Sequence, residues 1–397
     1  MGVDLGVRRP SGAAGGFWIV AVAFAVLMAF GTAPTPLWPL YAARDGFGPT
    51  TLTAVFSGLV IGAALSLLGV GHLSDRLGRR RMAEWALGAA ALAAVVFAGW
   101  EDVPGILAAR VLNGVAIGLM AGTATSYLFD LYARAYPGRN ARPAAMVATA
   151  ANLGGLALGP FAAGLVATWT SDPLLYTQIG FAVALGVMLA LVALVPETVD
   201  TGKAGRPPRF ALRPAGRTVF GSAGLLGFVA FGLFGLFASL GSSVVRDLGV
   251  DAPLLSALPT IVMFAVAACA QIALDRAPWR RVLLGGAVAF PVGLALAALA
   301  LVHPAYWLYV LGAAVAGGGA GLLFKTGLTR GAEVAQPYSR AGVLAVFYTI
   351  AYVGMAVPAL LFSLALRAFS TPATMIGCAV ALSLCALTAA LGVYRKH

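Results

Sequence analysis

Residues Gly71–Arg81 read GHLSDRLGRRR and place one aspartate and four arginines between two long apolar segments. A lipid-exposed helix cannot carry this much charge, because the hydrocarbon core has no water to solvate it. The stretch therefore predicts a short hydrophilic turn between two membrane spans. Since arginine and lysine gather in cytoplasmic turns, it also sets the orientation of the spans on either side.

The composition indicates a chain that crosses the membrane many times. Of the 397 residues, 60% are hydrophobic and 10% are charged, against roughly 25% charged residues in a soluble domain. The net charge of +12 does not predict a nucleic-acid partner, because the basic residues lie in short breaks between apolar segments. The three cysteines and three histidines lack metal-site spacing. We therefore predict no enzyme activity, no catalytic residue, no metal and no cofactor.

Apolar segments of about 20 residues, the length that crosses ~30 Å of hydrocarbon, occur twelve times. We therefore expect an all-α membrane protein with twelve transmembrane helices. The expected spans are 17–40, 51–72, 82–100, 105–129, 144–168 and 173–195 in the first half, and 218–241, 253–274, 282–302, 305–325, 340–366 and 372–393 in the second.

The basic residues predict which ends of the spans face the cytoplasm. With the N-terminus inside, the inner segments hold 22 of the lysines and arginines and the outer loops hold three. This asymmetry predicts that both termini are cytoplasmic. Because arginine far outnumbers lysine and alanine is abundant, we expect a bacterial protein of the cytoplasmic membrane, with the lipid bilayer as its surroundings.

The two halves of the chain resemble each other. Asp75-Arg76 follows the second span and Asp275-Arg276 follows the eighth, 200 residues later, and Gly118 and Gly318 match in the same way. Repeated six-helix halves are typical of a transporter whose substrate site lies between two bundles. The expected divisions are a tail at 1–16, a bundle at 17–195, a cytoplasmic linker at 196–217, a second bundle at 218–394 and a tail at 395–397.

Three stretches resemble motifs of the major facilitator superfamily. Gly71–Arg81 is similar to the superfamily's loop between helices 2 and 3, G-x-x-x-D-R-x-G-R-R. Arg110–Gly118 resembles R-x-x-Q-G-x-x-x-G, with Asn113 in place of Gln. Gly155–Gly164 resembles the G-x-x-x-G-P-x-x-G-G motif of its proton antiporters, with Ala163 in place of a glycine. The resemblance implies the twelve-helix fold and points to the bacterial drug/proton antiporter branch.

The resemblance also implies a role for the charged turn. In the superfamily, the acid that Asp75 matches is thought to meet the start of helix 11, where a helix N-terminus is partly positive. The base that Arg79 matches pairs with an acid that closes helix 4, and Asp130 stands at that place. Such contacts would latch the bundles together at the cytoplasmic side; the alternative is that the arginines set topology alone. The candidate latch residues are Gly71, Asp75, Arg76, Gly78, Arg79, Arg80 and Asp130.

The first span contains three prolines within six residues, Pro34, Pro36 and Pro39. We expect this helix to be kinked or unwound in its outer half, with carbonyls that need a cavity or a neighbour. Arg110 lies inside a span, where it either faces the cavity or pairs with Glu101 or Asp102. The candidate coupling or cavity residues are Thr32, Thr35, Trp38, Arg110, Asn113, Asn152, Tyr348 and Tyr352.

Two further patterns have two interpretations each. Small residues in helices 4 and 5 indicate close helix packing, or, by the resemblance, a hinge between bundles. Four phenylalanines spaced by three, Phe228 to Phe237, form either a lipid-facing stripe or an apolar lining of the cavity. The candidate hinge or packing residues are Gly114, Gly118, Gly155, Gly159, Pro160 and Gly164.

We predict a monomeric secondary transporter that uses proton-coupled efflux to remove a small amphipathic or drug-like molecule. The proton gradient is the expected energy source. The first span carries no carboxylate, so the coupling residue stays open. The alternative is a symporter or uniporter that takes up a sugar, an organic acid or another metabolite.

Overall fold

The structure, a computed structural model, describes residues 11–46, 48–69, 77–199, 210–214, 216–336 and 339–395. In this part of the chain twelve helical segments are long and apolar enough to cross a membrane, which confirms the predicted number. The first span consists of α1 (Ser11–Thr32), η1 (Thr35–Leu37) and α2 (Trp38–Asp45). The next three spans are α3 (Pro49–Gly69), α5 (Arg79–Gly99) and α6 (Val103–Ala135). The fifth span consists of α7 (Arg142–Thr149), η3 (Ala150–Gly154) and α8 (Gly155–Trp169), and the sixth is α9 (Pro173–Ala193). The segments after the linker are α10 (Gly216–Asp247), α11 (Pro253–Ala273), α12 (Trp279–Val302), α13 (Tyr306–Glu333), α14 (Arg340–Ala365) and α15 (Thr371–Tyr394).

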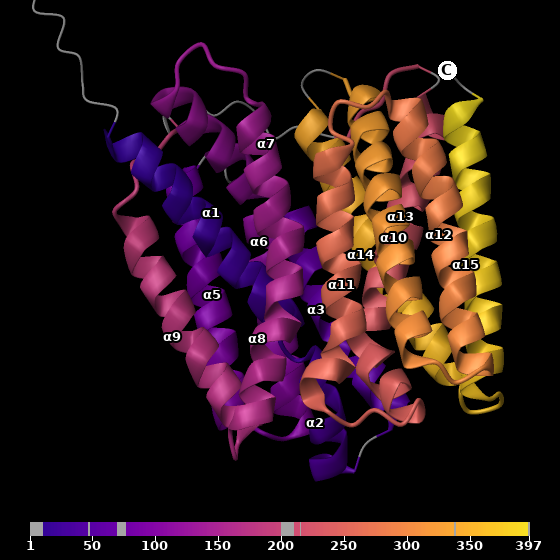
Figure 1. The fold of residues 1–397 in the computed structure, drawn as a ribbon. Helices are drawn as coiled ribbons and strands as arrows, with labels where there is room; N and C mark the ends of the chain where they lie inside the picture. The colour runs from indigo at the N-terminus through magenta and orange to yellow at the C-terminus, as the bar shows by residue number, and fades with distance from the viewer. Residues whose placement is uncertain are drawn as a thin grey trace, which may run out of the picture.

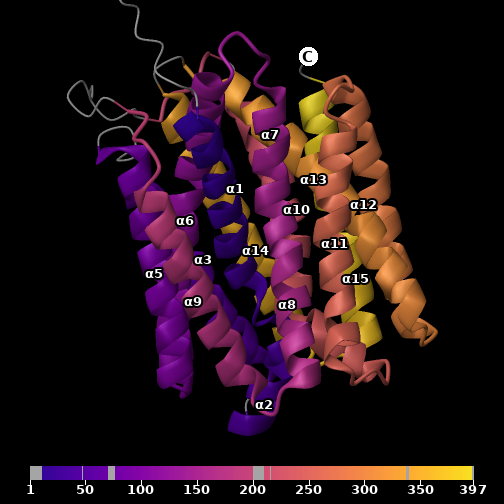
Figure 2. The same ribbon diagram turned by 60° about the vertical axis from the view of Figure 1, so that its left-hand side comes forward.

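The helices form two bundles that stand side by side, α1 to α9 and α10 to α15 (Figure 1). Helices α3 and α6 pack closely in the first bundle, and α12 and α13 do so in the second. Contacts between the bundles run along α8 with α11 and along α3 with α14. Both ends of the described chain lie on one side of the molecule, as Figures 1 and 2 show. We call this the terminal side and the other the opposite side.

Several helices extend further than the hydrophobic segments predicted. Helix α6 ends at Ala135 instead of 129, α13 ends at Glu333 instead of 325, and α10 ends at Asp247 instead of 241. The predicted limits were wrong here because hydropathy ends where the charged residues begin, whereas backbone hydrogen bonding continues beyond the apolar part. Charged side chains of these extensions therefore stand on helices whose positions are fixed by the bundles.

The first span is interrupted at its prolines, as expected. Helix α1 ends at Thr32, a 3₁₀ turn covers Thr35–Leu37, and α2 begins at Trp38. Pro34 has no N–H, so the carbonyl of Phe30 loses its helical donor. The interruption creates carbonyl acceptors inside the membrane that another helix must satisfy.

Glycines permit the closest approaches between helices of the first bundle. A Cβ on Gly114 would lie 2.9 Å from the backbone nitrogen of Ala63 on α3, and one on Gly118 would lie 2.8 Å from Ser66 Cβ. A Cβ on Gly159 would lie 2.6 Å from Thr32 Oγ1 on α1. These spacings are shorter than real Cβ contacts, so larger residues would force the helices apart.

Helix α8 of the first bundle packs against both bundles. A Cβ on Gly155 would lie 2.9 Å from Met28 Cβ on α1, whereas one on Gly164 would lie 3.2 Å from Leu254 Cα on α11 of the second bundle. Pro160 lies within the helix, and a π-helical turn at Ala150–Gly154 precedes it. The sequence did not predict this π turn, which contacts α1 of its own bundle and α11 of the other.

The end of the linker lies against the second bundle. Leu212 and Ala335 form an isolated antiparallel bridge, with Arg213 N–H donating to the Val334 carbonyl at 2.9 Å. Apart from this bridge, the described residues form helices and their connections only. The bridge holds residues 210–214 beside the connection between α13 and α14.

Candidate transport site

A cavity of about 510 Å³ opens between the bundles toward the terminal side. Helices α3 and α6 of the first bundle and α13 and α14 of the second line it. Its lining is mostly apolar and carries a single charge, that of Arg340. The polar side chains on its wall are Thr125, Ser126, Thr329, Arg340 and Tyr348.

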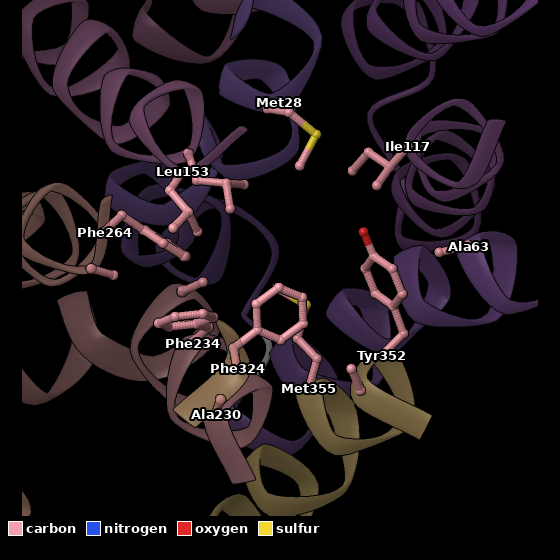
Figure 3. Packing of buried hydrophobic residues seen from close by; sticks show 14 of the residues in the cluster. Met28, Ala63, Ile117, Leu153, Ala230, Phe234, Phe264, Phe324, Tyr352 and Met355 are labelled. Carbon is pink, nitrogen blue, oxygen red and sulfur yellow. The ribbon is translucent and has the colours of Figure 1, made fainter. Parts of the chain in front are cut away.

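Deeper in the molecule, side chains from both bundles surround a central space (Figure 3). The first bundle contributes aliphatic side chains, among them Met28, Ile117 and Leu153. The second bundle contributes aromatic rings and Met355, and the hydroxyl of Tyr352 points into the space. The drawn side chains of the two walls therefore differ in chemistry, aliphatic in the first bundle and mainly aromatic in the second.

The phenylalanines of α10 face the protein and not the lipid. Phe231 lies edge-on to Tyr352 with ring centroids 5.2 Å apart, and it packs 5.0 Å from Phe324 of α13. Phe234 is 1% exposed and packs 4.9 Å from Phe264 of α11. Phe237 stacks on Tyr309 at 5.4 Å. The lipid-facing interpretation was therefore wrong for these three rings, because spacing alone does not tell which side of a drifting stripe is covered.

On the opposite side, direct hydrogen bonds close the space between the bundles. Thr35 Oγ1 and Trp38 Nε1 both donate to the Ala238 carbonyl of α10, at 3.0 and 3.3 Å. Thr53 of α3 and Ser363 of α14 share a hydrogen bond of 2.9 Å. The predicted cavity residues Thr35 and Trp38 thus belong to a seal, since both are 1% exposed. The structure is open to the terminal side and closed to the opposite side.

Arg110 and Asn113 cap the broken end of α1. Arg110 donates to the Gly31 carbonyl at 2.9 Å, and Asn113 Nδ2 donates to the Phe30 carbonyl at 3.5 Å. These are acceptors at the break before Pro34, where the helix dipole leaves partial negative charge. A cation near a helix C-terminus is favourable, which helps a buried arginine to be accommodated without an acid. Thr32 completes this packing with a hydrogen bond of 2.8 Å to the Leu156 carbonyl of α8.

Arg110 does not line the cavity in this conformation, because it is 1% exposed. Its guanidinium lies over Trp38 at 5.5 Å and over Phe56 at 5.1 Å from the ring centroids. It also does not pair with Glu101, because Arg44 binds that carboxylate at 2.9 Å. Within the described residues no carboxylate forms an ion pair with Arg110. The sequence located this residue but did not reveal that the helix break is its partner.

The sequence profile of the Major Facilitator Superfamily matches residues 19–359 of the chain. The chain belongs to the major facilitator superfamily. It is therefore a secondary transporter that works by alternating access, with the substrate reached from one side at a time. The opening on the terminal side and the seal on the opposite side fit one state of that cycle.

Solved structures of other transporters share the fold over nearly the whole chain. Comparison with curated protein sequences, in contrast, gives no significant match. One of the solved structures is the nucleoside transporter NupG, with 12% identity and a TM-score of 0.71, over 96% of this chain and 99% of that chain. Another is the xylose transporter XylE from E. coli in a partially occluded inward-open conformation, with 14% identity and a TM-score of 0.74, over 97% of this chain and 98% of that chain. A third is a bacterial homologue of the human lysosomal transporter Spinster in an inward-facing conformation, with 13% identity and a TM-score of 0.63, over 98% of this chain and 96% of that chain. At these identities the likeness concerns the fold.

In this superfamily member, the charged residues after the turn bind within the first bundle. Arg79 at the start of α5 forms an ion pair of 2.6 Å with Asp130 near the end of α6, as the resemblance implied. Both helices belong to one bundle, so this ion pair by itself lies within the first bundle, and the latch stays a prediction. Gly71, Asp75 and Arg76 lie outside the described residues.

Glu197, which follows α9, caps the start of α5. Its carboxylate accepts from the backbone N–H groups of Arg79 at 2.9 Å and of Arg80 at 3.0 Å. Gly78 precedes them with φ of +99°, a conformation that favours glycine, and a Cβ there would lie 2.8 Å from the Glu197 carboxyl carbon. Arg80 adds an ion pair of 3.3 Å to Glu84. The sequence did not single out Glu197 for this role, because the backbone groups that it caps lie 118 and 117 residues away in the chain.

A different ion pair connects the two bundles on the terminal side. Arg142, at the start of α7, donates to Asp275 at 2.7 Å, and Lys325 of α13 binds the other oxygen of Asp275 at 3.1 Å. Burial raises the pKa of the Asp275 carboxyl, but hydrogen bonds from Arg142 and Lys325 lower it more, so the pKa lies below its ordinary value of 3.8. Sequence reasoning identified Asp275 as a repeat of Asp75 but missed its partners, which lie 133 and 50 residues away.

The remaining candidates lie at the space between the bundles. Tyr348 lines the terminal-side cavity, and Tyr352 points into the central space one helical turn deeper. Asn152 is half-buried in the π turn of the fifth span. In the described structure neither tyrosine hydroxyl has a hydrogen-bond partner. These groups are available to a substrate.

Proposed function

We propose that this transporter exports small amphipathic molecules from the cytoplasm in exchange for protons. The terminal side would face the cytoplasm of a bacterial cell, because the described helix ends and connections on that side carry basic residues such as Arg134, Arg142 and Arg281, and such residues gather in cytoplasmic segments. The observation that carries the proposal is the central space between an aliphatic and an aromatic wall. Such a lining suits a ligand with a large apolar surface and few polar groups.

Proton exchange requires a group whose protonation changes during the cycle. Among the described residues that line the terminal-side cavity there is no carboxylate. We therefore assign coupling to terminal-side carboxylates that bind across helices, Asp275 first and Asp130 second. The pair of Arg142 and Asp275 joins the two bundles, so rocking that separates it would raise the pKa of the Asp275 carboxyl and link protonation to the change of state.

Uptake of a polar metabolite is the second candidate. The hydroxyls of Thr125, Ser126 and Thr329 on the cavity wall favour it. Among the structures of similar fold are transporters named for a nucleoside and for xylose. Uptake would use the same opening in the reverse direction, so direction must be measured.

The test is flux in proteoliposomes with an imposed pH gradient. A panel of labelled amphipathic compounds and sugars is added outside, while a trapped dye reports luminal pH. Proton antiport predicts that an acidic lumen drives accumulation of an amphipathic compound with loss of luminal protons. A control uses the Thr53→Cys/Ser363→Cys protein after oxidation, which holds the opposite side closed. Accumulation of a sugar driven by an acidic exterior would contradict the proposal and support uptake by symport.

A further inference from the structure

We propose that the substrate of this transporter is an aromatic molecule that carries hydrogen-bonding groups and no positive charge. The inference rests on the proposed transport of amphipathic molecules and names their chemical class. Three features of the central space support it: the aromatic wall, the free tyrosine hydroxyls and the distribution of charge.

The aromatic wall belongs to the second bundle alone. Phe231 and Phe234 of α10, Phe324 of α13 and Tyr352 of α14 form a connected group, with centroid distances of 5.0 to 5.7 Å for Phe231 and its three neighbours. The facing wall contains Met28 and other aliphatic side chains (Figure 3). A flat ring placed between these walls would pack edge or face against the phenyl groups and against flexible aliphatic groups opposite. The site thus favours aromatic molecules over aliphatic chains.

Two hydroxyls give this wall its polarity. Tyr348 and Tyr352 are four residues apart and so share a face of α14. Tyr348 lines the terminal-side cavity, and the Tyr352 oxygen points into the central space. Neither hydroxyl is hydrogen-bonded to another described residue. Because no protein group occupies either hydroxyl, a ligand oxygen or nitrogen that meets it can form a hydrogen bond in surroundings that are otherwise apolar.

The charges near this space are positive. Arg110 lies on α6 two turns beyond Ile117 toward the opposite side, and Arg340 lines the entrance on the terminal side. Among the described residues, no aspartate or glutamate lines the cavity, and Asp130 and Asp275 on the terminal side bind cations of the protein. Aromatic rings attract a cation. A cation that is desolvated near Arg110 and Arg340, without a carboxylate, loses more hydration free energy than its interaction with the rings returns. The site therefore excludes positively charged ligands.

Binding to the purified full-length protein in detergent tests this class without any gradient. We would compare three labelled ligands built on one ring system: 2-naphthalenemethanol, 2-methylnaphthalene and (2-naphthylmethyl)trimethylammonium, with binding to protein-free micelles subtracted. We expect 2-naphthalenemethanol to bind at least about 10-fold more tightly than the cation. Equal or tighter binding of the cation would overturn the proposal, and so would undetectable binding of 2-naphthalenemethanol.

Variants locate the effect. Tyr352→Phe is expected to weaken the binding of 2-naphthalenemethanol about 5-fold and to leave the binding of 2-methylnaphthalene unchanged, since only the hydroxyl is lost. Tyr176→Phe removes a hydroxyl from a tyrosine that is 51% exposed on α9 and should change neither ligand. Met355→Glu should strengthen the binding of the naphthyl cation at least about 10-fold, because it adds a carboxylate, whereas Met355→Gln should not. An unchanged ligand order in both Tyr352→Phe and Met355→Glu would contradict the assignment of the site.

The proposed function and this inference fail in different experiments. Flux without pH dependence would contradict proton exchange and leave the ligand order in detergent as it is. Conversely, pH-driven export of a cationic compound with tight binding of the naphthyl cation would support export and overturn the ligand class.

Discussion

The two sides of the molecule hold the bundles together in different ways. On the opposite side, neutral hydrogen bonds join them: Thr35 and Trp38 bind the Ala238 carbonyl, and Thr53 binds Ser363. On the terminal side, a cavity of about 510 Å³ separates α6 from α13 and α14. The cross-bundle bond there is ionic and lies at the edge, between Arg142 and Asp275. The difference indicates that buried neutral contacts seal the closed side, with an exposed bond from Arg367 to Thr50 beside them, whereas a partly exposed ion pair joins the bundles at the edge of the open side.

The two halves of the sequence also differ on the terminal side. Arg79 and Asp130 form an ion pair in the first bundle. Their counterparts 200 residues later are Trp279 and Arg330, and Arg330 lies over the Trp279 ring at 4.4 Å. The same two positions therefore meet in both halves, once as an ion pair and once as a cation–π contact. The duplicated unit preserves the contact between helix start and helix end while its chemistry changes.

The largest effect is expected from locking the opposite side. In a protein whose Cys269, Cys378 and Cys385 are serine, Thr53→Cys/Ser363→Cys should form a disulfide, because the two hydroxyl oxygens are 2.9 Å apart. Oxidation should reduce transport below about 5% of the reduced protein, since alternation requires this side to open. Each single cysteine variant serves as the control under the same oxidant. Full transport by the oxidised double variant would contradict the assignment of the seal.

Removal of the Arg110 cap should have the next largest effect. Arg110→Met leaves the Gly31 carbonyl without its donor and should lower the free energy of unfolding by about 2 kcal/mol. Thermal unfolding in detergent measures it. Arg44→Met removes an exposed ion pair and should change stability by less than about 1 kcal/mol. Unchanged stability of Arg110→Met together with lost transport would show that Arg110 acts on substrate or proton instead.

Asp275→Asn should break the ion pair with Arg142 that joins the bundles on the open side. It should lower the free energy of unfolding by about 1 kcal/mol, because the pair is partly exposed. The pKa of Asp275 is lowered in the folded state, so its stabilisation is present above the ordinary value of 3.8 and is lost as pH falls through the lower folded value. The stability difference between wild type and Asp275→Asn should therefore be constant from about pH 5 to 8. A difference that disappears between pH 7 and 5 would show that Arg142 and Lys325 do not hold the pKa of Asp275 below its ordinary value in this open state.

The smallest effect concerns the comparison of the two halves. Asp130→Asn breaks the ion pair with Arg79 and Trp279→Ala breaks the contact with Arg330, and each should cost about 0.5 to 1 kcal/mol. The exchange Arg79→Asp/Asp130→Arg should restore part of the stability lost in Asp130→Asn, as thermal unfolding would show. If only the first-half variants slow transport, the ion pair has a gating role that the cation–π contact lacks.

Much of the fold could be predicted because each span must be an apolar helix that satisfies its own backbone hydrogen bonds in the lipid. The twelve spans and the interruption at Pro34 follow from local composition, and the partner of Arg79 follows from the resemblance to the superfamily. The cap by Arg110 could not be predicted, because its acceptor, the Gly31 carbonyl, carries no side-chain signal. The inward face of Phe231 depends on how α10 packs between α13 and α14, which spacing within one helix does not contain. Long-range partners such as Arg142 and Asp275 likewise require the assembled bundles.

The central claim is that the space between the bundles opens to the terminal side while the seal of the opposite side holds. The direct measurement uses Thr125→Cys, whose position lines the cavity, in the Thr53→Cys/Ser363→Cys protein after oxidation and in its reduced form. The Thr125→Cys position should react with a membrane-impermeant maleimide from the terminal side at the same rate, whether or not the opposite side is cross-linked. In the cross-linked protein it should not react from the opposite side. Labelling of the cross-linked protein from the opposite side, or loss of terminal-side labelling on oxidation, would contradict the account.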